Sequence, residues 1–98
     1  MLESEVEARL RAKVESLGGK AFKFISDGNK GVPDRIICLP NCRIVFVETK
    51  RPKGGKISKL QKHRIKELQA LGFDARVINT YELVDQFIEE IRNEIQTP

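Results

Sequence analysis

The sequence is short of the residues that build zinc sites, disulfide frameworks and membrane spans. It has two cysteines and one histidine in 98 residues, whereas a structural zinc site needs about four nitrogen or sulfur ligands. Cys38 and Cys42 flank a predicted turn, and nothing indicates an oxidising compartment, so we interpret both as small strand residues. No apolar run approaches the roughly 20 residues that cross a bilayer. The acidic N-terminus lacks the basic start of a signal peptide, and we expect a cytoplasmic protein.

Acidic residues are absent where basic residues are densest. Between residues 50 and 66 there is no Asp or Glu, but Lys or Arg stands at positions 50, 51, 53, 56, 59, 62, 64 and 66. The last predicted helix carries mostly acids, so the chain should have a basic side and an acidic side. A basic run can be a solvated helix face, and it can equally be a phosphate-binding surface. The absence of Trp and the single Tyr leave few platforms on which single-stranded bases could stack.

Hydrophobic periodicity divides the chain into seven elements. Apolar residues at helical spacing that end at glycines predict helices, and alternating β-branched and aromatic residues predict strands. The short turn at Pro40-Asn41 makes the second and third strands an antiparallel hairpin. The predicted elements, in order, are a helix at 3–17, strands at 21–25, 34–39 and 43–49, a helix at 58–71, a strand at 73–79 and a helix at 81–94.

The order αβββαβα predicts an α/β fold in one domain over residues 1–98. An antiparallel meander followed by a helix and a further strand gives a mixed sheet with helices on its faces. The helix at 58–71 should bury Leu60, Ile65, Leu68 and Leu71. Ser58 is a possible cap for this helix, although no acid follows three positions later.

Charged residues interrupt the apolar pattern at the end of the third strand. Side chains alternate across a strand, so Glu48 and Lys50 share one face and Thr49 lies on the other. Asp34 begins the preceding strand, and in a tight hairpin it should lie beside the end of the third strand. The side chains of Asp34, Glu48 and Lys50 should therefore converge.

This arrangement has a chemical use. Two carboxylates and a backbone carbonyl, most simply that of Thr49, suit a hard divalent cation such as Mg²⁺ or Mn²⁺. A lysine beside the ion can orient or help deprotonate an attacking water, or offset developing negative charge. Glu-x-Lys alone is a weak signal, because such a pair on an exposed strand is often only a surface ion pair. Its combination with Pro-Asp on the neighbouring strand and a basic loop is much more specific.

These motifs resemble those of the VRR-NUC (virus-type replication-repair nuclease) family, within the PD-(D/E)xK nuclease superfamily. The likeness covers nearly the whole chain, and standalone members of this size are phage or bacterial proteins. It implies a restriction-endonuclease-like αβββαβα core. The motifs that carry it are a first helix ending in L-G-G, F-K-F before the turn G-V-P-D-R, the strand end V-E-T-K-R-P, a helix opening with S-K-L-Q, and a late L-G-F.

The resemblance also assigns roles to particular residues. Asp34 and Glu48 would be metal ligands for Mg²⁺ or Mn²⁺, Lys50 the catalytic lysine, and Gln61 a residue that supports the site. The family takes a further acid from its first helix. Glu3 fits best, but Glu7 lies one turn away on the same face, so the choice stays open.

Thr49 is the main departure from the family pattern, which often has an apolar residue at this position. Its side chain should face away from the metal, and we expect it to have little consequence. The single His63 is interpreted as a helix-surface residue rather than a catalytic group.

The expected activity is that of a metal-dependent, structure-selective DNA endonuclease. Resemblance to standalone members implies branched duplex such as the Holliday junction as substrate, and a homodimer in the cytoplasm of a bacterial or phage-infected host cell. The alternatives are a non-catalytic DNA-binding module with the same fold and, more remotely, a protein-interaction domain. The residues expected to bind DNA phosphates are Arg51, Lys53, Lys56, Lys59, Lys62 and Lys66.

Overall fold

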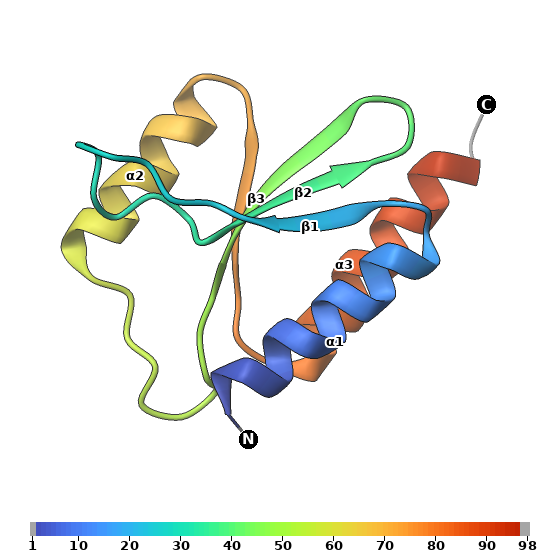
Figure 1. Cartoon of the computed structure of the whole chain (residues 1–98), viewed down its shortest axis with the longest axis horizontal. Helices are drawn as coiled ribbons and strands as arrows, with labels where there is room; N and C mark the ends of the chain where they lie inside the picture. The colour runs from blue at the N-terminus through green and yellow to red at the C-terminus, as the bar shows by residue number, and fades with distance from the viewer. Residues whose placement is uncertain (1, 97–98) are drawn as a thin grey trace.

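The computed structural model describes residues 2–96 and has the predicted αβββαβα order, which confirms the fold class (Figure 1). Each predicted element is present, and its ends lie within two residues of the prediction. The elements are α1 (Glu3–Ser16), β1 (Lys20–Lys23), β2 (Arg35–Leu39), β3 (Arg43–Thr49), α2 (Lys59–Ala70), β4 (Asp74–Ile78) and α3 (Tyr81–Gln96).

The four strands form one mixed sheet in the order β1-β2-β3-β4. The first two pairings are antiparallel, and β3 pairs in parallel with β4 because α2 carries the chain back across the sheet between them. Arg35 pairs with Val47, so the residue before β2 lies opposite the end of β3. This register brings Asp34 and the last residues of β3 together at one end of the two central strands.

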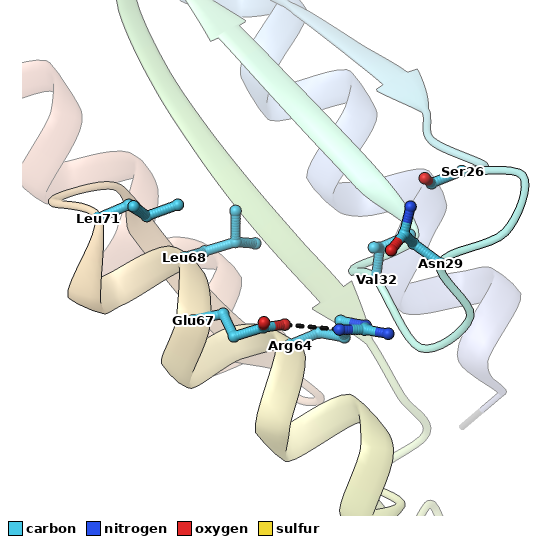
Figure 2. A pocket seen from close by; sticks show the side chains of 7 residues that line it. All are labelled: Ser26, Asn29, Val32, Arg64, Glu67, Leu68 and Leu71. Atoms are coloured by element: carbon cyan, nitrogen blue, oxygen red, sulfur yellow. Dashed lines mark hydrogen bonds and ion pairs between the residues drawn. The ribbon is translucent and has the colours of Figure 1, made fainter.

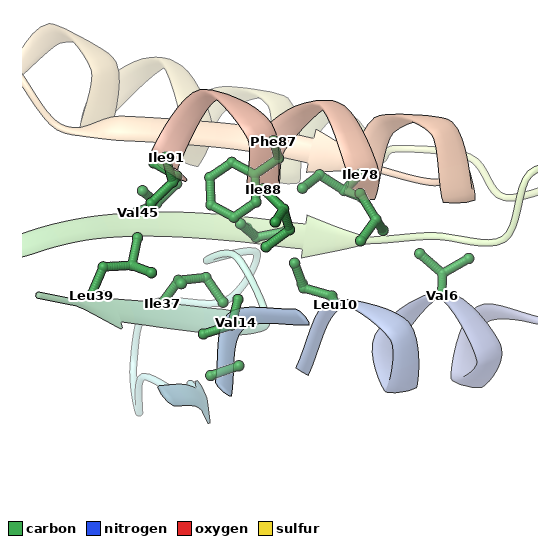
Figure 3. Close-up of a cluster of buried hydrophobic side chains, with 13 residues drawn as sticks. Val6, Leu10, Val14, Ile37, Leu39, Val45, Ile78, Phe87, Ile88 and Ile91 are labelled. Carbon is green, nitrogen blue, oxygen red and sulfur yellow. The ribbon is translucent and has the colours of Figure 1, made fainter. Parts of the chain in front are cut away.

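The apolar core lies on one face of the sheet, under α1 and α3. Figure 3 shows side chains of both helices directed at β2 and β3. Phe87 of α3 is 1% exposed and is among the largest fully buried side chains. In α1 every fourth residue from Val6 to Val14 is buried, as expected for a helix that packs one face on the core. The core consists of Val6, Leu10, Val14, Ala21, Ile37, Leu39, Val45, Val47, Ile78, Val84, Phe87, Ile88 and Ile91.

Helix α2 lies on the opposite side of the sheet, where it packs mainly against β4 (Figure 1). The predicted apolar stripe of α2 is therefore partly wrong: Ile65 is buried, but Leu60 and Leu71 are 42% and 74% exposed. A helix placed over one edge strand cannot cover four of its own apolar residues. It also leaves apolar side chains on this side of the sheet exposed, among them Phe22 of β1 and Ile44 of β3. We call this surface the open sheet face.

The hairpin between β2 and β3 differs from the prediction in one respect. Cys42 is not a strand residue but the last residue of a turn, where it is exposed and has φ of 62° after φ of 65° at Asn41. Two successive left-handed residues are what tightens this connection. Both cysteines are free thiols, and no helix within residues 2–96 is long and apolar enough to cross a membrane.

Candidate functional site

Carboxylates from three elements meet where β3 ends. Asp34 immediately precedes β2, and Glu3 and Glu7 stand on the first two turns of α1. Each of these three offers an oxygen, and the three oxygens lie within 4.8 Å of one another. We call Glu3, Glu7 and Asp34 the acidic cluster. Both first-helix acids considered from the sequence are thus in it, Glu3 exposed and Glu7 partly buried.

Thr49, the last residue of β3, holds Asp34 through two hydrogen bonds. Its backbone N–H donates to Asp34 Oδ1 at 2.9 Å, and its Oγ1 lies 2.6 Å from Asp34 Oδ2. The same Oγ1 lies 2.9 Å from Oε1 of Glu7. The expectation that the Thr49 side chain has little consequence is wrong. Thr49 does point away from Glu48, as strand alternation requires, but two members of the acidic cluster reach it on that side.

Glu7 has a second partner in Arg35, whose guanidinium lies 3.4 Å from Oε2. Partial burial acts to raise the pKa of Glu7, but hydrogen bonds with Thr49 and Asp34 and the charge of Arg35 together lower it. The pKa of Asp34 is raised, because its burial and the neighbouring Glu7 outweigh the hydrogen bonds from Thr49. The environment therefore favours the ionised form of Glu7 and the protonated form of Asp34.

Glu48 forms a second group on the α2 side of the sheet. Its side chain is 6% exposed, and its Oε2 lies 3.6 Å from Lys50 Nζ. Burial, reinforced by the negative charges of Asp34 and Glu3, raises the pKa of Glu48 to about 7, although Lys50 acts to lower it. Asp34 lies near enough for its charge to act on Glu48, but Glu48 is not among the carboxylates that meet within 4.8 Å of one another. The predicted convergence of Asp34, Glu48 and Lys50 is therefore present only in part.

Gln61 joins Glu48 to the start of α2. Its Nε2 donates to Glu48 Oε2 at 3.3 Å, while its Oε1 accepts from the backbone N–H of Ser58 at 2.9 Å. The Ser58 hydroxyl accepts in turn from the Gln61 backbone N–H at 3.0 Å, which completes a capping box. An acid is absent from this position, as noted from the sequence, but a glutamine closes the same box while keeping a donor for Glu48.

Three contacts could not be predicted from the sequence. They are the contact of Glu7 with Arg35, that of Thr49 with Asp34 and that of Thr49 with Glu7. The available signal for Arg35 was its place directly after Asp34. Conversely, Glu48 lies outside the compact acidic cluster found among residues 2–96, although the charges of Asp34 and, to a smaller extent, Glu3 act on it.

Known proteins resemble this chain in sequence and in fold. The family model of the VRR-NUC domain matches residues 2–81. The chain belongs to the VRR-NUC family. It is 42% identical over 81 residues to p44 of Acyrthosiphon pisum secondary endosymbiont phage 1, described as a candidate nuclease, a match that covers 83% of this chain and 86% of p44.

Solved VRR-NUC structures share the fold. One, a VRR-NUC domain, is 30% identical and superposes with a TM-score of 0.84, covering 89% of this chain and 94% of the other. A second, a VRR-NUC domain protein, is 22% identical with a TM-score of 0.63 over 98% of this chain and 89% of the other, and shows the fold alone. Together with the match to p44, the family supports a nuclease.

The VRR-NUC assignment suggests a divalent metal, and the donor set of this chain fits one. Carboxylate oxygens are the ligands that hard cations prefer. Three carboxylates within 4.8 Å repel one another unless a cation or proton lies between them. Arg35 contacts Glu7 from the edge and offsets only part of this charge. The acidic cluster therefore has the chemistry of a site for a hard divalent ion.

A basic surface borders the site. The six residues predicted to contact phosphates are all exposed, and none has an acidic partner within 4.0 Å in the described part of the chain. The acids of α3 differ, because Asp85, Glu90 and Glu94 are paired with arginines of α1, β4 and β3. The positive charge between residues 51 and 66 is thus left available to a polyanion.

A cavity of about 210 Å³ lies beside the site, between α2 and the loop before β2 (Figure 2). Arg64 closes one wall, where it donates to the carbonyl of Lys30 at 3.0 Å and to Glu67 at 2.7 Å. The Arg64 contact ties the loop that ends at Asp34 to α2. The lining residues are Ser26, Asn29, Val32, Arg64, Glu67, Leu68 and Leu71.

Proposed function

We propose that this chain is an endonuclease that hydrolyses DNA phosphodiesters with Mg²⁺ or Mn²⁺. The observation that carries the proposal is the position of Asp34, which belongs to the acidic cluster and lies near enough to Glu48, the ion-pair partner of Lys50, for its charge to act on that carboxyl. A cluster of carboxylates beside an unpaired basic surface repels phosphates unless a cation is present. A metal-dependent phosphodiesterase needs both features together.

Each group has a distinct task in this mechanism. Asp34, Glu48 and the Thr49 backbone carbonyl would hold the ion, with Glu3 and Glu7 as the first-helix acids. The bound ion would lower the pKa of a water and stabilise charge on the phosphoryl oxygen. Lys50 would orient the attacking water or offset the developing charge, and Gln61 would hold the Glu48 carboxylate through its amide.

Branched duplex DNA is the substrate class that the surface favours. The exposed lysines can contact phosphates, which position a duplex without reading its sequence. The single Tyr and the absence of Trp leave little for stacking single-stranded bases. We infer structure-selective cleavage, with Holliday junctions as the leading candidate, in the cytoplasm of a bacterial or phage-infected host cell.

A homodimer would supply the two active sites that symmetric cutting of a junction needs. The open sheet face supports this proposal, because Phe22, Ile44 and Phe73 are 48%, 41% and 45% exposed on it. Phe46 links Phe24 and Phe73 there, with ring centroids 6.0 and 5.5 Å away. An exposed apolar surface of this kind marks an interaction site in many proteins. Light scattering should give twice the monomer mass for wild type and the monomer mass for Ile44→Glu; a monomeric wild type would remove the dimer.

The decisive experiment is cleavage of an end-labelled DNA panel by wild type and three variants, with Mg²⁺, Mn²⁺ or EDTA. The panel holds linear duplex, single strand, flap and four-way junction. Asp34→Asn and Lys50→Ala should lose cleavage while still binding DNA, and Asp27→Asn, in an exposed loop, is the matched control that should cut normally. Cleavage by either site variant would refute the mechanism. Salt-sensitive binding of the junction without cleavage by wild type would instead support the non-catalytic binding module.

A further inference from the structure

The side chain of Thr49 occupies a core position, at which a strand residue normally contributes only apolar packing. It is 0% exposed and shares a strand face with the core residues Val45 and Val47. A buried hydroxyl without a hydrogen bond destabilises a protein, and valine would fill nearly the same space. The presence of the hydroxyl at this position therefore points to its polar partners.

Those partners are two carboxylates that approach from different elements. One residue binds both oxygens of Asp34, through its N–H at 2.9 Å and its Oγ1 at 2.6 Å, and so fixes the plane of that carboxylate. Oγ1 also lies 2.9 Å from Glu7 Oε1, and Arg35 lies 3.4 Å from the other oxygen of Glu7. Both oxygens of both acids are thus positioned before any ligand binds.

The hydroxyl has a single proton, and it can donate that proton to only one of the two carboxylates at a time. The facing oxygen of the other carboxylate then receives no proton from Thr49 Oγ1, although that carboxylate keeps its second donor, the Thr49 N–H for Asp34 or Arg35 for Glu7. This geometry brings two negative oxygens close together at a point fixed by a buried residue. Substitution of a residue that hydrogen-bonds to a metal ligand commonly lowers metal affinity by about 10- to 100-fold.

We propose that Thr49 is a positioning residue that couples Glu7 of α1 to Asp34 of β2 and thereby sets the affinity of the acidic cluster for a divalent cation. The inference rests on the proposed function for the identity of the site, but it concerns the side chain of Thr49 and not its backbone carbonyl. It also makes Glu7 the first-helix acid whose orientation is controlled.

The test measures Mn²⁺ binding to the protein without DNA, by electron paramagnetic resonance. Thr49→Val removes the hydroxyl but keeps the shape and the N–H, and we expect its Kd for Mn²⁺ to rise about 10-fold. Thr49→Ser restores the hydroxyl and should bind Mn²⁺ within about twofold of wild type. Thr80→Val, which removes a helix-capping hydroxyl at the start of α3, is the control that should leave the Kd unchanged.

Thermal melting without metal separates positioning from a purely structural role, since Thr49→Val should melt no lower than Thr80→Val while binding Mn²⁺ more weakly. Unchanged Mn²⁺ affinity in Thr49→Val would overturn the proposal, as would a wild type that binds no Mn²⁺. If wild type binds Mn²⁺ and Thr49→Val binds it about 10-fold more weakly, but no DNA is cut, the positioning role stands and the nuclease proposal fails.

Discussion

Replacement of Glu48 by glutamine should stabilise the metal-free protein at alkaline pH while it abolishes cleavage. Glu48 is 4% exposed, and burial raises its pKa to about 7 in the folded chain from the usual 4.5 of a glutamate in water. Between these values the folded protein binds more protons than the unfolded chain, so the free energy of unfolding falls as pH rises. The Glu48 carboxyl group contributes most to the free energy of unfolding below pH 4.5, where it is protonated. This stability is lost as the pH rises through about 7.

The size of the effect follows from the pKa difference, since one pH unit corresponds to about 1.4 kcal/mol. From pH 5 to pH 8 the wild-type protein should lose roughly 2–3 kcal/mol of stability through Glu48. Glutamine has almost the same shape and can still accept from Gln61, but it has no charge to desolvate. Glu48→Gln should therefore lack this part of the pH dependence.

Urea denaturation in EDTA at pH 5 and at pH 8 measures the difference directly. Glu15→Gln is the matched control, because Glu15 is exposed and has no ion-pair partner within 4.0 Å in residues 2–96; it should keep the wild-type pH dependence. Saturating Mg²⁺ at pH 8 should stabilise wild type more than Glu48→Gln, since the ion favours the charged carboxylate. If wild type and Glu48→Gln lose equal stability as the pH rises, the raised pKa assigned to Glu48 would be refuted.

Three further changes test other parts of the structure. Lys62→Ala combined with Lys66→Ala should weaken junction binding and reduce the slope of log K against log salt by about 2, measured by fluorescence anisotropy; an unchanged slope would remove α2 from the interface. Gly31→Ala should lower the free energy of unfolding by about 1–3 kcal/mol in urea titration, because φ is +86° and a Cβ would lie 2.7 Å from a side chain of α2. Gln61→Glu should keep the helix content seen by circular dichroism but cut DNA at least about 10-fold more slowly, because its carboxylate cannot donate to Glu48; normal cleavage would show that the amide donor is dispensable.

The order and bounds of the elements could be predicted because each depends on local chemistry. Gly18 ends α1 with φ of +84°, and Thr80 caps α3 through a 3.0 Å bond to the N–H of Leu83. Such signals lie within a few residues of the boundary that they set. The hairpin likewise followed from a short turn between two apolar runs, and its register placed Asp34 opposite the end of β3.

The remaining features depend on distances between elements that periodicity does not contain. The exposure of Leu60 and Leu71 follows from where α2 lies over the sheet, which its own sequence does not specify. The contact of Thr49 with Glu7 could not be predicted, because it depends on α1 placing Glu7 against the face of β3 that is opposite to Glu48. Alternation indicated correctly that the Thr49 side chain points away from Glu48, but the expectation that it faces away from the metal site was wrong, because Glu7 and Asp34 meet it there.

The chain uses its two basic residue types in different ways. Arg9, Arg43 and Arg76 bind acids of α3 at 2.7–2.9 Å and so hold α3 to α1, β3 and β4, while the lysines from 53 to 66 have no acidic partner within 4.0 Å among the described residues. A guanidinium imposes a planar, two-pronged geometry on its partner, whereas a lysine ammonium is a mobile point charge on a flexible stem. A surface of lysines can therefore follow phosphates whose spacing is irregular, as it is where duplex arms diverge. The rigid cations maintain the fold, and the compliant ones let a single small surface accommodate backbones of different shape.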